Sequence, residues 1–256
     1  MELPKNRFKA ALKEGRHQLG IWNSISGSTV PEAMAAVGFD WVLIDTEHAM
    51  TEAHQVQPAL QAIAGYPDVS AIVRPVSNDP AYIKRYLDMG AQTLMIPYVQ
   101  NVEEARAAVT AMRYPPNGMR GMAGAVRAGR FGLIPDYLKR AEEELCLIVQ
   151  VETIQAMEQL EEIASVDGVD GVFIGPADLS GSMGHPGDQG HPEVIAAIED
   201  AFTRLKAIGV PSGILTLNED FARRLMELGA GFTAVGLDLT SMMRDVRGLK
   251  ARFSDG

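Results

Sequence analysis

Several features that mark common classes of protein are missing from this sequence of 256 residues. It has one cysteine, Cys146, so no disulfide can form within the chain, and the apolar run 145–149 favours a buried side chain there over a nucleophile. No apolar stretch approaches the roughly 18 residues that a membrane-spanning helix needs. The first ten residues are charged and lack the apolar segment of a secretory signal. These absences predict a cytoplasmic protein that does not enter a membrane.

Basic residues are scarce, with 23 lysines and arginines against 33 aspartates and glutamates, and the formal net charge is −10. Such a chain lacks the positive field that attracts nucleic acids or anionic membranes, so neither is an expected partner. All lysines fall in segments that we predict to be helical, which disfavours a Schiff-base mechanism, because that mechanism needs a desolvated lysine near the substrate. The glycine-rich nucleotide-binding motifs and the G-x-S-x-G motif are missing too, and no nucleotide cofactor is expected.

Short apolar runs alternate with amphipathic segments along the whole chain. Most of the runs are continuously apolar, which is typical of parallel strands buried on both faces. Eight repeats of strand and helix, without a linker, indicate one α/β domain over residues 1–256, and the length fits a single (β/α)₈ TIM barrel. A doubly wound sheet is the alternative. The predicted strands are 19–24, 41–45, 71–74, 93–98, 145–152, 171–174, 212–215 and 233–237.

Residues that start and stop helices lie between these runs. Asp79 followed by Pro80 predicts the start of a helix that ends at Gly90. One connection, residues 117–132, is unusually long for a compact domain, is rich in glycine and carries three arginines. We expect this segment either at the mouth of the active site or as an ordered surface loop or subunit contact.

Barrel enzymes carry their active sites where strands end and loops begin, and the strand ends of this sequence are polar. Glu152 and Asp178 follow consecutive predicted strands. Their carboxylates are therefore expected to be neighbours, which repel each other unless a proton or a cation lies between them. Two carboxylates completed by water and substrate oxygens suit Mg²⁺ or Mn²⁺. The residues predict a divalent metal site, with a carboxylate pair that shares one proton as the alternative.

Two further side chains at the strand ends suit the handling of an anionic substrate. His48 directly follows a buried strand and can accept a proton near neutral pH, with Asp45 or Asp88 as the carboxylate that would orient its ring. Arg74 offers a charged fork of donors to a carboxylate or an enolate oxygen. The alternative for Arg74 is a buried ion pair with a carboxylate at the rim.

The run Gly175-Pro176-Ala177 follows the sixth predicted strand and has little side chain. Backbone amides can therefore approach a ligand closely at this point. Only Gly175 and Ala177 offer an N–H group, because proline has none. A substrate carboxylate could bind there beside the metal, and a tight turn from strand to helix is the alternative.

At these positions the sequence resembles the HpcH/HpaI aldolase family, the class II pyruvate aldolases. The resemblance covers nearly the whole chain. The sequence departs from the family in one loop, where residues 121–127 read GMAGAVR and the family has a run such as Gly-Val-Gly after the arginine. Several long motifs occur in the family's order. The most specific are 38–48 (GFDWVLIDTEH), 73–75 (VRP), 113–121 (RYPPNGMRG), 149–152 (VQVE) and 171–180 (GVFIGPADLS).

The resemblance implies a barrel with a swapped C-terminal helix, a homo-hexamer, and cleavage of 2-keto-4-hydroxy acids to pyruvate, or hydroxypyruvate, and an aldehyde. It implies that Glu152 and Asp178 bind Mg²⁺, Mn²⁺ or Co²⁺. His48 is the implied base with Asp88 as its partner, and Arg74 is the implied stabiliser of the enolate. The implied substrate positions are Gln150, Ala177 and Asp178 for pyruvate, beside Gly175 and Pro176, with Trp22 and Leu215 in the aldehyde pocket.

Three other functions are weighed against this one. A metal-dependent oxaloacetate decarboxylase needs the metal and the enolate stabilisation but no base for a hydroxyl, so His48 distinguishes it. A non-catalytic binder of 2-keto acids would be expected to lack His48, Arg74 or a metal ligand, and all are present. A lyase for CoA thioesters needs basic groups that this acidic chain offers sparingly.

Overall fold

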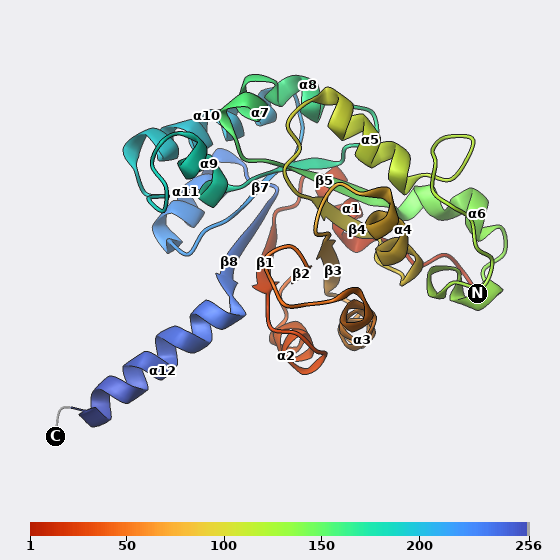
Figure 1. Cartoon of the computed structure of the whole chain (residues 1–256), viewed down its shortest axis with the longest axis horizontal. Helices are drawn as coiled ribbons and strands as arrows, with labels where there is room; N and C mark the ends of the chain where they lie inside the picture. Colours follow the sequence, from red (N-terminus) through yellow and green to blue (C-terminus); the bar gives the residue numbers. More distant parts are fainter. Residues whose placement is uncertain (255–256) are drawn as a thin grey trace.

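The computed structural model describes residues 1–254 and contains a closed barrel of eight parallel strands (Figure 1). Each strand pairs with the next one along the chain, and β8 pairs with β1. Helices surround the barrel, so the predicted (β/α)₈ architecture is confirmed. The strands are β1 (Gln18–Asn23), β2 (Trp41–Asp45), β3 (Ser70–Arg74), β4 (Thr93–Ile96), β5 (Cys146–Val151), β6 (Gly171–Ile174), β7 (Ser212–Leu215) and β8 (Phe232–Leu237).

All eight predicted strands are present, and their bounds differ from the prediction mainly at β4 and β5. β4 ends at Ile96 rather than at residue 98, because Pro97 has no N–H for the sheet and Tyr98 adopts a left-handed conformation with a φ of 54°. β5 is one residue shorter at each end than predicted, so Glu152 directly follows the strand.

The helices begin and end at residues that the sequence marks. Asp79 caps α4 by accepting a hydrogen bond of 2.7 Å from the Ala81 amide, with Pro80 in the first turn. Gly90 follows that helix with a φ of 99°. The helices are α1 (Arg7–Lys13), α2 (Thr29–Val37), α3 (Ala53–Ile63), α4 (Pro80–Asp88), α5 (Val102–Met112), α6 (Tyr137–Arg140), α7 (Ile154–Glu158), α8 (Leu160–Ala164), α9 (Pro176–Ser182), α10 (Pro192–Ala207), α11 (Glu219–Leu228) and α12 (Asp238–Ser254), with short 3₁₀ segments η1 (Arg127–Gly132) and η2 (Ala141–Glu144).

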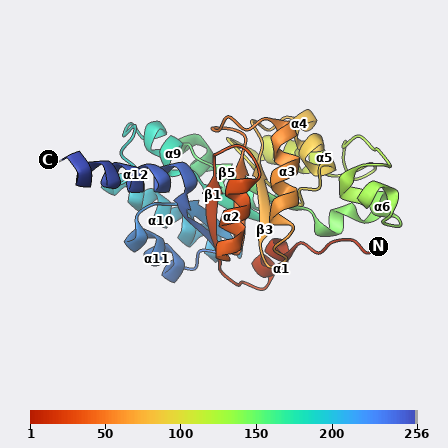
Figure 2. The ribbon, with the colours of Figure 1, turned by 90° about the horizontal axis from the view of Figure 1, so that it is seen from below.

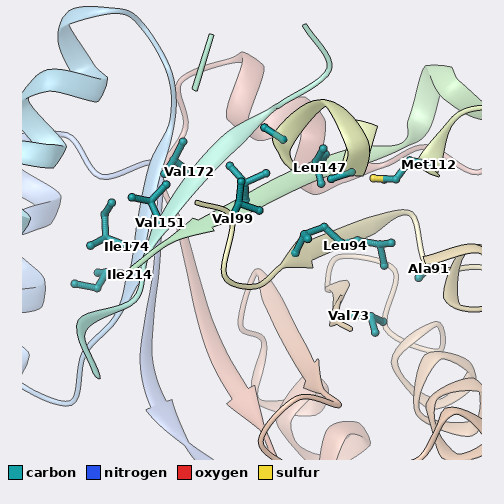
Figure 3. Packing of buried hydrophobic residues seen from close by; sticks show 14 of the residues in the cluster. Val73, Ala91, Leu94, Val99, Met112, Leu147, Val151, Val172, Ile174 and Ile214 are labelled. Atoms are coloured by element: carbon teal, nitrogen blue, oxygen red, sulfur yellow. The ribbon is translucent and has the colours of Figure 1, made fainter. Parts of the chain in front are cut away.

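Alternate residues of each strand face the barrel interior or the surrounding helices. In β2, Trp41 and Leu43 lie in an inner apolar cluster, whereas Val42 and Ile44 belong to the outer cluster between barrel and helices. Figure 3 shows part of the outer cluster, which draws residues from most of the strands. Because the alternation continues to the strand ends, it also decides which polar residues reach the barrel mouth.

Large aromatic rings fill the barrel interior, and glycines make room for them. A Cβ on Gly20 would overlap the Trp41 ring, and a Cβ on Gly213 would overlap the Phe232 ring. Phe8 of α1 closes the amino-terminal end of the barrel, with its ring edge-on to Trp41 at 6.0 Å and to Phe232 at 5.4 Å between centroids. The barrel interior is therefore a packed core rather than a channel.

The segment 117–132 lies at the amino-terminal end of the barrel. It follows α5, which returns the chain to that end, and precedes the start of β5. Arg127 donates a hydrogen bond of 2.6 Å to the Met89 carbonyl, just after α4. With Arg130 it lines a cavity of about 210 Å³ that also contacts the first residues of β3 and β4. The prediction that this segment lies at the mouth of its own chain's active site is therefore wrong.

The last helix, α12, extends away from the barrel (Figures 1 and 2). Of its residues only Asp238 is buried, and six large apolar side chains along it are exposed on average by about half of their surface. These exposed side chains are Leu239, Met242, Met243, Val246, Leu249 and Phe253. Crossing a membrane needs a long helix of apolar residues, and the described part of the chain contains none.

Candidate active site

Four polar side chains meet at the carboxyl end of the barrel. Asp45, Arg74 and Gln150 each lie two residues beyond a member of the inner apolar cluster. They therefore point into the barrel, and Glu152 has the same parity as Gln150. All four side chains are buried. Trp22, at the top of the inner cluster, forms the apolar floor below them.

Arg74 is held by a bidentate ion pair with Asp45. Arg74 Nε donates to Asp45 Oδ1 at 2.8 Å, and Nη2 donates to Oδ2 at 2.7 Å. The guanidinium lies over the Trp22 ring, 4.9 Å from its centroid. The buried ion pair that the sequence left open for Arg74 is thus present, but it uses two of the three nitrogens. Nη1 faces Gln150 Oε1 at 3.5 Å and Glu47 Oε2 at 2.8 Å.

This pair holds the charged guanidinium of Arg74 in one position at the barrel mouth. Burial alone would raise the pKa of Asp45 and lower that of Arg74, but their hydrogen bonds and opposite charges outweigh it. The pKa of Asp45 therefore lies below its ordinary value and that of Arg74 above it. Asp45 also accepts bonds from the Trp22 indole at 3.3 Å and the Glu47 amide at 3.0 Å. Its oxygens are thus occupied, and Asp45 anchors Arg74 rather than orienting His48.

Glu152 is held by Gln150 of β5 and by residues that follow β4 and β6. Its Oε1 accepts a hydrogen bond of 2.9 Å from the Tyr98 amide, and its Oε2 accepts one of 2.8 Å from Gln150 Nε2. The left-handed conformation of Tyr98 directs that amide toward the site. Gly175 at the end of β6 leaves the space for Glu152, because a Cβ there would overlap Oε2. These contacts fix the carboxylate without pairing it to a cation.

Besides Asp45, three carboxylates share the site with the guanidinium of Arg74: Glu47, Glu152 and Asp178. Burial is the largest cause that raises the pKa of Glu152 to about 7, and the charges of Asp178 and Glu47 raise it further. Burial also raises the pKa of Glu47 to about 7, against the opposing charge of Arg74. Glu47 Oε2 lies near Arg74 Nη1 but off the line of a hydrogen bond, and is buried without such a partner. Additional positive charge would stabilise this group.

The turn into α9 offers fewer free amides than predicted. The Gly175 amide donates to the Val151 carbonyl at 3.2 Å and so extends the pairing of β5 with β6. The prediction that this N–H is available to a ligand is therefore wrong. Ala177 and Asp178 lie in the first turn of α9, which starts at Pro176 and whose amides have no acceptor within the helix. They remain the amides that an anion could reach.

Trp22 and Leu215 give the site an apolar wall. Trp22 is buried in the inner cluster, 5.4 Å from the Phe173 ring centroid, and Leu215 packs against the same cluster while partly exposed. Trp22 is the last but one residue of β1, and Leu215 is the last residue of β7. That they line the aldehyde pocket, as the resemblance implies, stays a prediction.

His48 and Asp88 do not meet within the chain. The His48 side chain is 66% exposed after β2, with Nε2 3.8 Å from Glu47 Oε2. Asp88 ends α4, which leads from the carboxyl end of β3 back to the start of β4, over about 13 Å for nine residues. Its Oδ1 accepts a hydrogen bond of 2.6 Å from Arg120. The expected pair is therefore not formed among residues 1–254.

Two residues belong to this site that the sequence did not single out. Glu47 contributes a further, half-buried carboxylate, and Tyr98 contributes a backbone donor to Glu152. The motif that contains Asp45 and His48 could have pointed to Glu47. Pro97 before Tyr98 was the available signal for a turn, although the left-handed conformation has no sequence signature in a tyrosine.

Comparison with known proteins places the chain among aldolases. The family model described as HpcH/HpaI aldolase/citrate lyase matches residues 18–244. A pyruvate aldolase from Rhizobium etli is 58% identical over 254 residues, which are 99% of this chain and 100% of that protein. A 4-hydroxy-2-oxo-heptane-1,7-dioate aldolase from Escherichia coli is 53% identical over 250 residues, 97% and 95% of the two chains. A solved HpcH/HpaI aldolase/citrate lyase family protein from Burkholderia cenocepacia is 37% identical, with a TM-score of 0.93 and coverage of 97% and 99%.

Proposed function

This chain belongs to the HpcH/HpaI aldolase/citrate lyase family, and we propose that it cleaves 2-keto-4-hydroxy acids in the cytoplasm by a metal-dependent retro-aldol reaction. Aldolases that match it over nearly their whole length make it a carbon–carbon lyase. The observation that carries the site assignment is the fixed charge of Arg74 in one site with the buried carboxylate of Glu152 and the exposed carboxylate of Asp178. The products would be an aldehyde and pyruvate or hydroxypyruvate.

A divalent cation fits the donor set at the barrel mouth. Glu152 and Asp178 are oxygen donors whose mutual repulsion raises the pKa of Glu152, and Mg²⁺, Mn²⁺ or Co²⁺ would supply the balancing charge. Within residues 1–254, Glu47 does not join them in a set of three ligand atoms within 4.8 Å of one another. Water and substrate oxygens would therefore complete the shell of an ion held by Glu152 and Asp178.

The chain's own groups then bind and activate the substrate. A bound cation supplies Lewis-acid polarisation of the 2-keto oxygen. Arg74 Nη1 donates toward the oxygen on which enolate charge develops, and its position is set before the reaction begins. Gln150 and the amides of Ala177 and Asp178 bind the substrate carboxylate. His48 accepts the proton of the C4 hydroxyl as the C3–C4 bond breaks.

Pyruvate release tests this function directly. The protein is stripped with EDTA, given Mg²⁺, Mn²⁺ or Co²⁺, and supplied with a racemic 2-keto-4-hydroxy acid. We expect pyruvate to appear only after metal is added, because the carboxylates alone cannot polarise the keto group. Equal release without metal would show that Glu152 and Asp178 are not metal ligands. No release with any of the three metals would contradict the reaction itself.

Replacing His48 by alanine separates the aldol reaction from decarboxylation of oxaloacetate. Loss of a general base typically costs about 10²–10⁴-fold in rate, so we expect aldol cleavage to fall by that order. Decarboxylation needs no proton acceptor for a hydroxyl and should keep its rate. The exposed His54 provides the matched control, since His54→Ala removes a solvated imidazole elsewhere. A parallel fall in both reactions would contradict the assigned role of His48.

We further propose that the chain forms a homo-hexamer in which α12 packs on a neighbouring copy. The exposed apolar side chains of α12 support this, because a helix with such a surface requires cover. A neighbouring copy could also bring its Asp88 to His48, which one chain does not do. Leu249→Asp is expected to reduce the sedimenting mass, whereas Lys250→Glu on the same helix should not. A parent chain that sediments as a monomer at micromolar concentration would contradict the assembly.

A further inference from the structure

The connection between α9 and α10, residues 183–191, holds titratable side chains that the proposed aldol reaction does not use. α9 begins where β6 ends, and α10 leads back to the start of β7. The connection therefore lies at the carboxyl end of the barrel, beside the candidate active site. Gly184 and Gly187 have φ values of 84° and 82°, in the region that favours glycine.

His185, His191 and Glu193 lie together at this point. The two imidazole rings are stacked, with centroids 3.5 Å apart and planes inclined by 15°. His185 Nε2 is 2.8 Å from Glu193 Oε2, and the Glu193 amide donates to His191 Nδ1 at 3.3 Å. Among residues 1–254 this is the one group of three His, Cys, Asp or Glu residues whose ligand atoms all lie within 4.8 Å of one another.

Two imidazoles and one carboxylate are ligands for a transition metal rather than for Mg²⁺. Zn²⁺ accepts a His₂Glu set and keeps a position open for water, whereas Mg²⁺ prefers oxygen ligands and retains its waters. We propose that His185, His191 and Glu193 form a second metal site, for Zn²⁺, Co²⁺ or Ni²⁺. Its ion would tie the connection to the first turn of α10, where Glu193 offsets the positive end of the helix dipole.

Binding requires a small rearrangement that the contacts permit. Two imidazoles on one tetrahedral zinc have ring centroids about 5 Å apart, given Zn–N bonds of roughly 2 Å, so the stacked rings must separate. The long bond from the Glu193 amide to His191 Nδ1 is lost if this nitrogen becomes the ligand. Any proton between His185 Nε2 and Glu193 Oε2 is released, because metal ligands must be deprotonated.

An ion at this site would also order the segment behind the candidate active site. The His185 amide donates to the Ser180 carbonyl at 2.8 Å, and Ser180 belongs to the short helix that carries Asp178. None of its three ligands belongs to the groups assigned to the aldol reaction. Its occupancy should change the stability of the protein more than the rate of the reaction supported by Mg²⁺.

A Co²⁺ titration of the untagged protein tests the site. The starting protein carries Glu152→Gln and Asp178→Asn, which remove the carboxylate site, and the visible absorption of Co²⁺ reports imidazole ligation. We expect about one equivalent of Co²⁺ to bind, and we expect its absorption to be lost after adding either His185→Ala or His191→Ala. His54→Ala in the same background should retain it. Binding that is absent from the starting protein, or unchanged by His185→Ala and His191→Ala, would overturn the site.

Thermal unfolding provides an independent measurement that does not depend on absorption. At about a hundredfold excess over Kd, Zn²⁺ should raise the Tm of the same starting protein by roughly 5–10 °C. His185→Ala should abolish this shift, and Mg²⁺ should not produce it. An equal shift in His185→Ala would contradict the assignment. Neither test uses pyruvate release. The results can therefore contradict the second metal site while the aldolase function stands, and they can support that site even if the aldolase function is contradicted.

Discussion

Replacing Arg74 by alanine is expected to lower the turnover of aldol cleavage by about 10²–10³-fold while a divalent metal still binds. Arg74 supplies positive charge among the carboxylates of the site, where it lowers the pKa of Glu47 against the effect of burial. Its Nη1 group is directed into the site because Asp45 holds the other two nitrogens. Loss of a donor that is positioned in advance removes stabilisation of the developing enolate, and water in the vacated space must reorganise to replace it.

The measurement must separate this effect from loss of folding. Alanine at position 74 leaves Asp45 buried without its partner, and breaking such a pair typically costs about 3–5 kcal/mol of stability. Denaturant unfolding should therefore accompany the kinetics, with rates compared below the start of unfolding. Arg74→Lys keeps the charge but loses the bidentate fork, so its turnover should lie between those of the parent and Arg74→Ala. Near-normal turnover in a folded Arg74→Ala protein would remove Arg74 from the mechanism.

The strands and most of the site could be predicted because a barrel strand has a simple pattern. Continuous apolar runs located β2, β6 and β7 at their observed bounds. Parity within a run then decides orientation: Leu43 and Ile72 face the barrel interior, so Asp45 and Arg74 must face the mouth. The order and the parity of the strands therefore predict that side chains far apart along the chain lie close together at the barrel mouth.

What the sequence did not predict depends on conformation between strands and on contacts across the chain. The left-handed turn at Tyr98 follows from how β4 leaves the barrel, and a tyrosine carries no preference for it. The local sequence leaves the Gly175 amide without an acceptor and so predicts that a ligand can use it. The actual acceptor, the Val151 carbonyl, belongs to a different strand and becomes visible only once the two strands are paired. The 117–132 segment was harder to place, although its position between a helix and the next strand fixes it at the amino-terminal end.

Glu152→Gln and Asp178→Asn are each expected to abolish tight Mn²⁺ binding at the carboxylate site and to lower aldol cleavage by at least about 10³-fold. Either change removes one of the two charged ligands while it preserves the shape of the side chain. Isothermal titration with Mn²⁺ would measure the binding, and the pyruvate assay would measure the rate. Glu52→Gln, an exposed substitution at the start of α3, is the control that should change neither. A variant at position 152 or 178 that binds Mn²⁺ like the parent would exclude that residue as a ligand.

Metal affinity should also depend on pH in a direction that the burial of Glu152 dictates. Without metal, its pKa of about 7 lies above the ordinary value of 4.5 for a glutamate. The folded protein therefore keeps a proton between about pH 4.5 and 7 that the unfolded chain loses, and metal-free stability falls as pH rises through this window. Metal must displace that proton, so affinity should weaken by up to about tenfold for each pH unit below 7. Glu47→Gln removes one of the charges that raise this pKa, and the pH dependence of Mn²⁺ binding should then move to lower pH. An affinity that is constant between about pH 6 and 8 would show that Glu152 is already ionised in the free protein, and that the cation does not provide the charge balance proposed for this site.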